Sequence, residues 1–177
     1  MGLDAVELIL GWEDCFGISI SEAEAEKMFT TREVVQSVYE KVRSAKPEDT
    51  GCLATRAFLR LRNAFQQEGV PRKAVRPETK VTSLLSTRQR RDILSTVCER
   101  AGLRPLKRLP LGLQFTFGRV KDVVLDAVIG QHQALRRAGL GWSQVQVREV
   151  VRAVMYAQLA LRRFSDDAEF AKDLKID

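Results

Sequence analysis

The chain has 177 residues, of which 45% are hydrophobic, and carries a formal net charge of +6. This composition is ordinary for a globular protein of one or two domains. No apolar run reaches the roughly 20 residues of a membrane-spanning helix, and the first residues lack the basic and apolar segments of a secretion signal. We therefore expect a cytoplasmic protein without a membrane partner.

The charge is distributed unevenly along the chain. Residues 1–50 hold 5 Lys or Arg against 11 Asp or Glu, residues 51–141 hold 18 against 6, and residues 142–177 hold 6 of each. The three regions thus carry net charges of −6, +12 and 0. Such asymmetry predicts surfaces with different partners.

Apolar periodicity and capping residues predict an all-α fold. Helices are expected over residues 3–16, 21–29, 30–43, 53–68, 87–101, 120–137 and 143–161. Ser21, Thr30 and Ser143 each begin a capping box with the residue three positions further on. The alternating residues 111–117 could form a short extended piece, and the tail from residue 165 onwards is expected to fray.

The first predicted helix combines two kinds of residue. Leu3, Val6 and Leu10 form an apolar stripe, and Gly17 stands where the helix should end. Its acidic residues are Asp4, Glu7, Glu13 and Asp14.

Little in the sequence points to catalysis or to metal binding. His132 is the only histidine, and neither a GxSxG nor an HExxH motif accompanies it, so we expect it on a helix surface. The three cysteines are far apart without a CxxC pair, which favours reduced, mostly buried thiols and excludes a recognisable zinc pattern. Trp12 and Trp142 are expected to anchor the core. We therefore predict no catalytic residue, no bound metal and no enzyme activity.

Several segments near the start of the chain follow the order of helices in one known family. They are LDAVEL at 3–8, WEDCFGISI at 12–20, AEAEK at 23–27 and TREVV at 31–35. Together they resemble the second, third and fourth helices of the acyl carrier proteins. In that family the second helix follows an Asp-Ser-Leu motif whose serine carries a phosphopantetheine arm.

The other end of the chain resembles the missing start of this pattern. Residues 143–161 resemble the first helix of the family, and residues 170–177 are similar to the loop that ends in the aspartate of the motif. The resemblance therefore implies a circularly permuted carrier domain made of residues 1–49 and 141–177. Its two ends are expected to lie close together, with Gly2 at the position of the serine.

The middle of the chain, residues 50–140, resembles a second, degenerate carrier domain inserted into the first. Its segments are 58–68 for the first helix, 69–85 for the long loop, 88–101 for the second helix and 117 onwards for the last helix. Thr87 stands at its serine position, and the neighbouring Ser86 leaves modification of this domain open. The resemblance thus implies two acyl-carrier-like four-helix bundles, and with Gly2 and Thr87 at the two serine positions it implies no phosphopantetheine and no other cofactor.

The acidic residues of the first helix match positions that the family uses to dock basic patches on partner enzymes, and we count Leu10 with them as a candidate partner-binding residue. Such complementarity favours encounter and orientation. Alternatively, Asp4 and Glu7 favour the helix dipole, and the acidic face is simply solvated.

The basic middle also leaves several interpretations open. Its candidate cations are Arg88, Arg90 and Arg91, together with Arg72, Lys73, Arg76, Lys107 and Arg108. They could form a solvated face, a surface for an acidic protein, or a nucleic-acid surface. Nucleic acid is the least favoured, because no nucleic-acid motif and no interleaved aromatic residues accompany them.

These observations predict a non-enzymatic, acyl-carrier-like interaction or scaffold module near fatty acid or polyketide metabolism. Its partners would be enzymes or carriers of that metabolism. One alternative is binding of anionic polymers by the basic middle. Another is exchange of the C-terminal helix between chains, so that the protein would be a monomer or a helix-swapped dimer.

Overall fold

The computed structural model confirms the all-α prediction for the residues that it describes, which are 2–85, 90–103, 118–161 and 163–176. These residues form eight helices, and their only β pairing is three isolated bridges. None of the described helices is long and apolar enough to cross a membrane.

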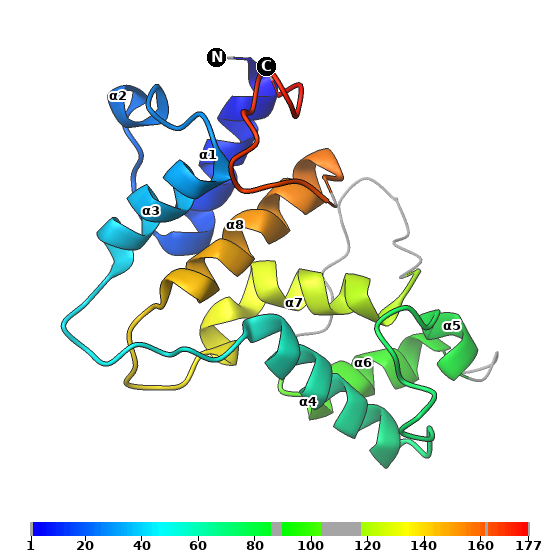
Figure 1. Cartoon of the computed structure of the whole chain (residues 1–177). Coiled ribbons are helices and arrows are strands. Elements are labelled where there is room, and N and C mark those ends of the chain that lie inside the picture. Colours follow the sequence, from blue (N-terminus) through cyan, green and yellow to red (C-terminus); the bar gives the residue numbers. More distant parts are fainter. Residues whose placement is uncertain (1, 86–89, 104–117, 162, 177) are drawn as a thin grey trace. The chain divides into compact units, whose positions relative to one another are not determined.

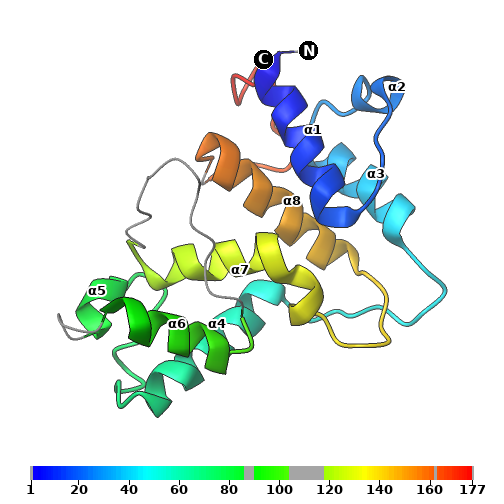
Figure 2. The same cartoon turned by 180° about the vertical axis from the view of Figure 1, so that it is seen from behind.

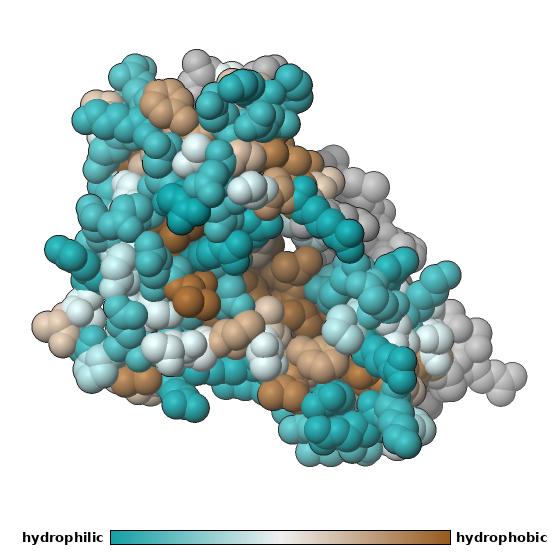
Figure 3. Space-filling view, in the orientation of Figure 1, coloured by the Kyte–Doolittle hydropathy of each residue, from teal (hydrophilic) through white to brown (hydrophobic). Residues whose placement is uncertain are grey.

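The chain divides into two units (Figure 1). Unit 1 combines Met1–Cys52 with Arg137–Asp177, and unit 2 is Leu53–Arg136. Unit 1 contains 12 Lys or Arg and 17 Asp or Glu, whereas unit 2 contains 17 and 6, so their formal charges are −5 and +11. Hydrophilic side chains cover most of the face drawn in Figure 3.

Unit 1 is built around α8. Its helices are α1 (Leu3–Phe16), α2 (Glu22–Ala25), α3 (Thr31–Val42) and α8 (Gln144–Leu159). α8 lies against both α1 and α3 (Figures 1 and 2). Trp12 of α1 is buried, and its indole N–H donates to the Val151 carbonyl at 3.4 Å. Trp142 is also buried, which confirms both tryptophans as core residues.

Gly11 allows α1 and α8 to approach each other closely. A Cβ at this position would lie 2.8 Å from Cγ1 of Val154 and 2.7 Å from Nε2 of Gln158. The Gln158 amide also donates to the Glu7 carbonyl at 2.9 Å, so a side chain of α8 bonds directly to the backbone of α1. There is no room for a larger residue without movement of a helix or of these side chains.

Replacing Gly11 with alanine should therefore destabilise unit 1. Alanine favours the helix by about 1 kcal/mol, but overpacking costs about 1–3 kcal/mol, so we expect a net loss of up to about 2 kcal/mol. Urea unfolding followed by tryptophan fluorescence measures this loss, because both tryptophans belong to unit 1. Gly130→Ala is the matched control, because a Cβ there has no neighbour within 4 Å. The control variant should be more stable than wild type when its unfolding is followed by circular dichroism. A Gly11→Ala variant that was also more stable than wild type would contradict the close approach of α1 and α8.

Local capping explains most helix boundaries in unit 1. The capping boxes predicted at Ser21 and Thr30 are confirmed, with the Glu33 carboxylate accepting from the Thr30 amide at 2.9 Å. α2 ends at Ala25, earlier than predicted, because the chain continues in tight turns in which the Met28 amide donates to the Ala25 carbonyl at 3.0 Å.

The predicted capping box at the start of α8 is only half formed. The Ser143 hydroxyl accepts from the Gln146 amide at 3.4 Å, as expected. The Gln146 side chain does not return to Ser143, because it donates instead to the Gly51 carbonyl at 2.9 Å. The Ser143 hydroxyl also donates to the carbonyl of the buried Asp49 at 2.9 Å. The start of α8 therefore holds the segment that leads out of unit 1.

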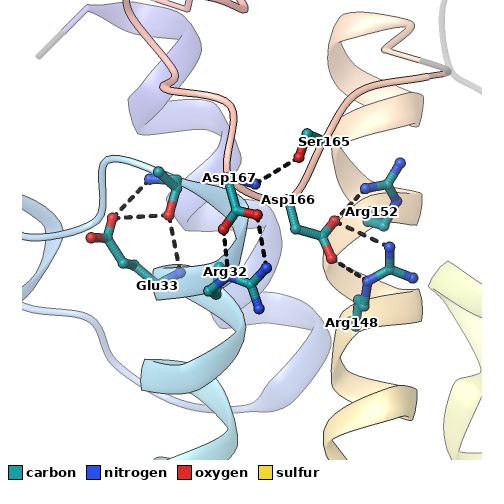
Figure 4. A network of polar contacts seen from close by, with 8 residues as sticks. Arg32, Glu33, Arg148, Arg152, Ser165, Asp166 and Asp167 are labelled. Atoms are coloured by element: carbon teal, nitrogen blue, oxygen red, sulfur yellow. Dashed lines mark hydrogen bonds and ion pairs between the residues drawn. The ribbon is translucent and has the colours of Figure 1, made fainter.

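The C-terminal segment, residues 163–176, is folded against unit 1, and the prediction of a frayed tail is wrong. Figure 4 shows the segment between α3 and α8, with Asp167 directed at Arg32 and Asp166 at two arginines of α8. Nη2 of Arg32 lies 2.8 Å from Oδ2 of Asp167, and Nη1 of Arg152 lies 2.5 Å from Oδ1 of Asp166. Two neighbouring carboxylates thus fix the segment to two different helices.

Apolar contacts hold the rest of this segment. The Phe170 ring centroid lies 6.4 Å from that of Trp12, the Phe170 amide donates to the Phe29 carbonyl at 2.8 Å, and Ile176 is buried. The start of α1 and the C-terminal segment lie side by side in both views (Figures 1 and 2), which agrees with the predicted closeness of the two ends. Residues 1 and 177 themselves are outside the described residues.

Unit 2 is built around α4. Its helices are α4 (Leu53–Gln67), α5 (Val81–Leu84), α6 (Arg90–Arg100) and α7 (Val120–Leu135). α4 lies against α6 and α7, and its buried residues are Leu53, Ala57, Leu61, Ala64 and Phe65. α5 falls within residues 69–85, for which the resemblance implies a long loop. The possible extended piece at 111–117 lies outside the described residues.

In unit 1, the C-terminal segment pairs with the start of α3. Thr30, the N-cap residue of α3, forms an isolated bridge with Glu169. Two residues into the helix, the Arg32 amide donates to the Asp166 carbonyl at 2.9 Å. The two partners in the C-terminal segment, Glu169 and Asp166, are thus three residues apart.

Unit 2 repeats this pairing at the start of α7. Arg119, the N-cap residue, forms a bridge with Lys80, and the Lys121 amide donates to the Pro77 carbonyl at 2.9 Å. The spacing, two residues along the helix and three along the loop, is the same as in unit 1. The two units therefore attach a loop to a helix N-terminus in the same register.

Candidate functional site

The apolar residues of α1 divide between two faces of the helix. Leu8 and Trp12 are 1% and 2% exposed and face the core. Leu3, Val6 and Leu10 are 83%, 40% and 54% exposed. The stripe that the sequence singles out is therefore not the one that packs into unit 1.

Acidic side chains alternate with this exposed stripe. Leu3, Glu7, Leu10 and Asp14 follow one another at spacings of four, three and four residues, so they form one ridge along the helix. Glu7 and Asp14 are exposed, as is Asp4 in the first turn. We call the surface formed by these exposed residues the α1 face; it consists of Leu3, Asp4, Val6, Glu7, Leu10 and Asp14.

Glu13 differs from the other predicted docking residues. It is half-buried, and its Oε1 accepts from the Ile20 amide at 2.6 Å. Its carboxylate therefore holds the turn between α1 and α2. This bond explains an acidic residue late in the helix, where the helix dipole does not favour one.

The α1 face combines exposed apolar side chains with exposed carboxylates. Exposed leucines supply apolar area that solvent disfavours, and grouped apolar side chains with a polar border mark interaction sites. Carboxylates beside such side chains favour the approach of positively charged groups.

The start of α1 offers no attachment chemistry. Gly2 is the N-cap residue, with an extended backbone at φ −79° and ψ 176°, and it has no side chain to carry a group or to cap the helix. Beside α1, a cavity of about 30 Å³ is lined by apolar residues that include Ala5, Ile9, Met28 and Phe170. That volume holds about one water molecule, so it leaves no space for a long apolar chain.

The candidate residues near the start of α6 are largely undescribed. Ser86, Thr87 and Arg88 lie outside the described residues. Arg90 and Arg91 open α6, and only their backbone is described. Lys107 and Arg108 also lie outside.

Many described cations of unit 2 are engaged within that unit. The guanidinium groups of Arg56 and Arg60 donate to the Leu135 and Ala134 carbonyls, both at 3.1 Å, where the C-terminus of α7 favours positive charge. Other ion pairs join Arg119 and Lys121 to Glu78, and Arg100 to Glu68. The exposed cations of the loop between α4 and α5 are Arg72, Lys73, Arg76 and Lys80.

The expectation of a surface histidine is wrong. His132 is buried, and its Nδ1 lies 3.0 Å from the Ile129 carbonyl oxygen, to which it donates. It stands four residues after Val128 and three before Leu135, which are both buried on α7. This spacing, present in the sequence, indicates an inward-facing residue.

Other reactive groups are shielded. Burial, with a smaller contribution from the Asp14 charge, raises the pKa of Cys15 to about 11. Burial likewise raises the pKa of Cys98 to about 11. These thiols stay protonated at neutral pH and are poor nucleophiles. Among the described residues, no group of three His, Cys, Asp or Glu side chains is placed to hold a metal.

No protein-family model matches the sequence, and no solved structure matches the fold.

Proposed function

We propose that the chain is an acyl-carrier-like interaction module that works without a phosphopantetheine arm. It would consist of two carrier-like bundles, of which unit 1 is circularly permuted. Through the α1 face it would dock proteins of acyl-carrier-dependent metabolism. The observation that carries the proposal is the exposed ridge of Leu3, Glu7, Leu10 and Asp14.

The order of elements supports a permuted relationship between the units. In the permuted order, unit 1 would begin with α8 and the C-terminal segment, and after the break between the two chain ends it would run through α1, the short α2 and α3. Unit 2 runs from α4 through a long loop to α6 and then α7. The last helix in this order is α3 in unit 1 and α7 in unit 2. In unit 1 the C-terminal segment pairs with Thr30, the N-cap residue of α3, and in unit 2 the loop after α4 pairs with Arg119, the N-cap residue of α7.

Two glycines support the same alignment. Gly17 ends α1 with φ 64° and Gly102 follows α6 with φ 66°, and the next residue donates to the carbonyl five positions earlier in both cases. Counting 15 residues back from these glycines reaches Gly2 and Thr87, the two positions that the family resemblance aligns with the modified serine.

The α1 face suits a partner with an apolar pocket bordered by Lys and Arg. Leu10 lies at the centre of the ridge and would enter the pocket, while Glu7 and Asp14 on either side of it would meet the basic border. A central apolar residue of this kind carries much of the binding energy of an interface.

Replacing Leu10 with lysine should abolish partner binding. The variant places a positive charge where the partner is expected to be basic, and we expect a loss of at least about 2 kcal/mol, or roughly 30-fold in affinity. Affinity capture from extract, with quantitative mass spectrometry, would compare wild type with this variant. Val145→Lys is the matched control, because Val145 on α8 is 55% exposed. If both variants captured the same proteins as wild type, the α1 face would not be the docking site.

The missing arm can be tested directly. Incubation with coenzyme A and a broad-specificity phosphopantetheinyl transferase should leave the intact mass unchanged. A stoichiometric gain of mass would overturn the proposal of an arm-free carrier, and peptide mapping would then examine Ser86 and Thr87.

Two alternatives keep specific support. The charge of +11 on unit 2 favours an anionic polymer, although many of its described cations are paired internally. A steep decrease of DNA or RNA binding with salt would support that alternative. Unit 1 combines both ends of the chain, an arrangement that permits exchange of the C-terminal helix between copies.

A further inference from the structure

Unit 2 contains a cleft of about 350 Å³ between the loop that follows α4 and the helix α5. It is lined chiefly by Val70, Pro71, Ala74, Ser83, Leu84 and Leu85. Glu68 also borders it, and Nη1 of Arg100 lies 2.7 Å from the Glu68 carboxylate. Most of the lining residues are thus apolar, and the Glu68 carboxylate is engaged in an ion pair.

Exposed cations lie in the loop that lines one side of this cleft. Arg72 and Lys73 lie between the lining residues Pro71 and Ala74, and both are exposed. Arg76 is exposed in the same loop, and its Nε donates to the Lys73 carbonyl at 3.2 Å, which stabilises the turn. A cleft lined mostly by apolar residues, with cations in the adjoining loop, has the chemistry that the α1 face would bind.

We infer that the α1 face of one copy docks into the basic cleft of unit 2 of a second copy. This inference rests on the proposed function in one respect, that the α1 face is a protein-docking surface. Leu3 and Leu10 are seven residues apart, or roughly 10 Å along the helix, and would enter the apolar cleft. Glu7 and Asp14 would then meet Arg72 and Lys73.

Long-range electrostatics favour the same contact. Unit 1 carries a formal charge of −5 and unit 2 one of +11. Unit 1 of one copy and unit 2 of another, which are oppositely charged, therefore attract each other. The contact joins two different surfaces. Copies that dock reciprocally close as a dimer, whereas copies that cannot do so extend into chains. An external partner of the α1 face would compete with this self-association.

Light scattering and sedimentation velocity on the full chain test the inference. We expect the average mass to exceed the monomer mass of 20.0 kDa, to rise with protein concentration and to fall with added salt. Leu10→Lys and the double variant Arg72→Glu/Lys73→Glu should each weaken association at least about tenfold, because each loses one side of the contact. The controls are Val145→Lys and Arg43→Glu/Lys46→Glu, which change exposed residues outside the contact.

Mixing the two impaired variants gives the decisive measurement. Leu10→Lys retains an intact cleft, and Arg72→Glu/Lys73→Glu retains an intact α1 face. Each variant alone should be monomeric, whereas an equimolar mixture should form a 1:1 complex. An interface between two α1 faces would not be restored by mixing, so failure of the mixture to associate would overturn the inference.

Other outcomes separate this inference from the proposed function. A wild type that stays monomeric at all concentrations would overturn the inference, while loss of captured partners with Leu10→Lys would still support the docking function. Dimers that resist salt and are unaffected by Leu10→Lys would indicate helix exchange, and would also overturn the inference. Salt-sensitive, variant-sensitive association without captured partners would support the inference and contradict the proposed function.

Discussion

Truncation of Trp12 to alanine should lower the free energy of unfolding of unit 1 by about 3–5 kcal/mol. The side chain is 2% exposed, donates to the Val151 carbonyl and lies beside Phe170. Its removal would leave a cavity where α1 meets α8 and the C-terminal segment, and would also remove the indole hydrogen bond to the Val151 carbonyl. Urea unfolding followed by the fluorescence of Trp142 and by circular dichroism would measure the loss.

Leu10→Ala is the control on the same helix. Because Leu10 is 54% exposed, its truncation should change the stability by no more than about 0.5 kcal/mol. The pair of variants thus separates the two apolar faces of α1. A large loss with Leu10→Ala and a small loss with Trp12→Ala would contradict the described orientation of the helix, and with it the α1 face.

Helix positions could be predicted from the sequence because their determinants are local. The predicted helix at 53–68 corresponds to Leu53–Gln67, since its apolar residues recur at helical spacing and Gly69 follows with φ 81°. The predicted helix at 30–43 corresponds to Thr31–Val42, since Thr30 and Glu33 form the capping box from within four residues.

Features that depend on distant residues could not be predicted in the same way. The C-terminal segment is held by an ion pair between Asp167 and Arg32, which are 135 positions apart. The Gln146 side chain reaches Gly51, 95 positions away, in place of the predicted local cap. A pattern of neighbouring residues contains no information about such partners.

The candidate site shows the same division. The family resemblance singles out the acidic residues and Leu10, but α1 is apolar on two sides, so periodicity alone cannot say which side packs inward. Burial of the large Trp12 settles the orientation and leaves Leu3 and Leu10 exposed. The cleft of unit 2 was not predicted either, because it forms between a loop and the unpredicted helix α5.

The stability of unit 1 should depend on pH through Asp166. Burial alone would raise the pKa of this carboxyl group, but hydrogen bonds from Arg148 and Arg152 outweigh burial, and the pKa lies below its ordinary value. In the unfolded chain the pKa is about 3.9. The carboxylate therefore stabilises the fold fully above that pH, and its contribution is lost as the pH falls through the lower, folded pKa.

Asp166→Asn should accordingly destabilise unit 1 at neutral pH by roughly 1–2 kcal/mol, since the two arginines lose a charged acceptor and Arg148 is half exposed to solvent. The difference from wild type should decrease as the pH falls below the unfolded pKa of about 3.9 and Asp166 of the wild type becomes protonated. Urea unfolding at a series of pH values, followed by tryptophan fluorescence, measures both effects. Asp167→Asn is the control, and it should cost less because solvent screens its exposed pair with Arg32. A loss for Asp166→Asn that stayed constant over this pH range would show that the side chain acts through its shape, and would contradict a role for its charge in fixing the C-terminal segment.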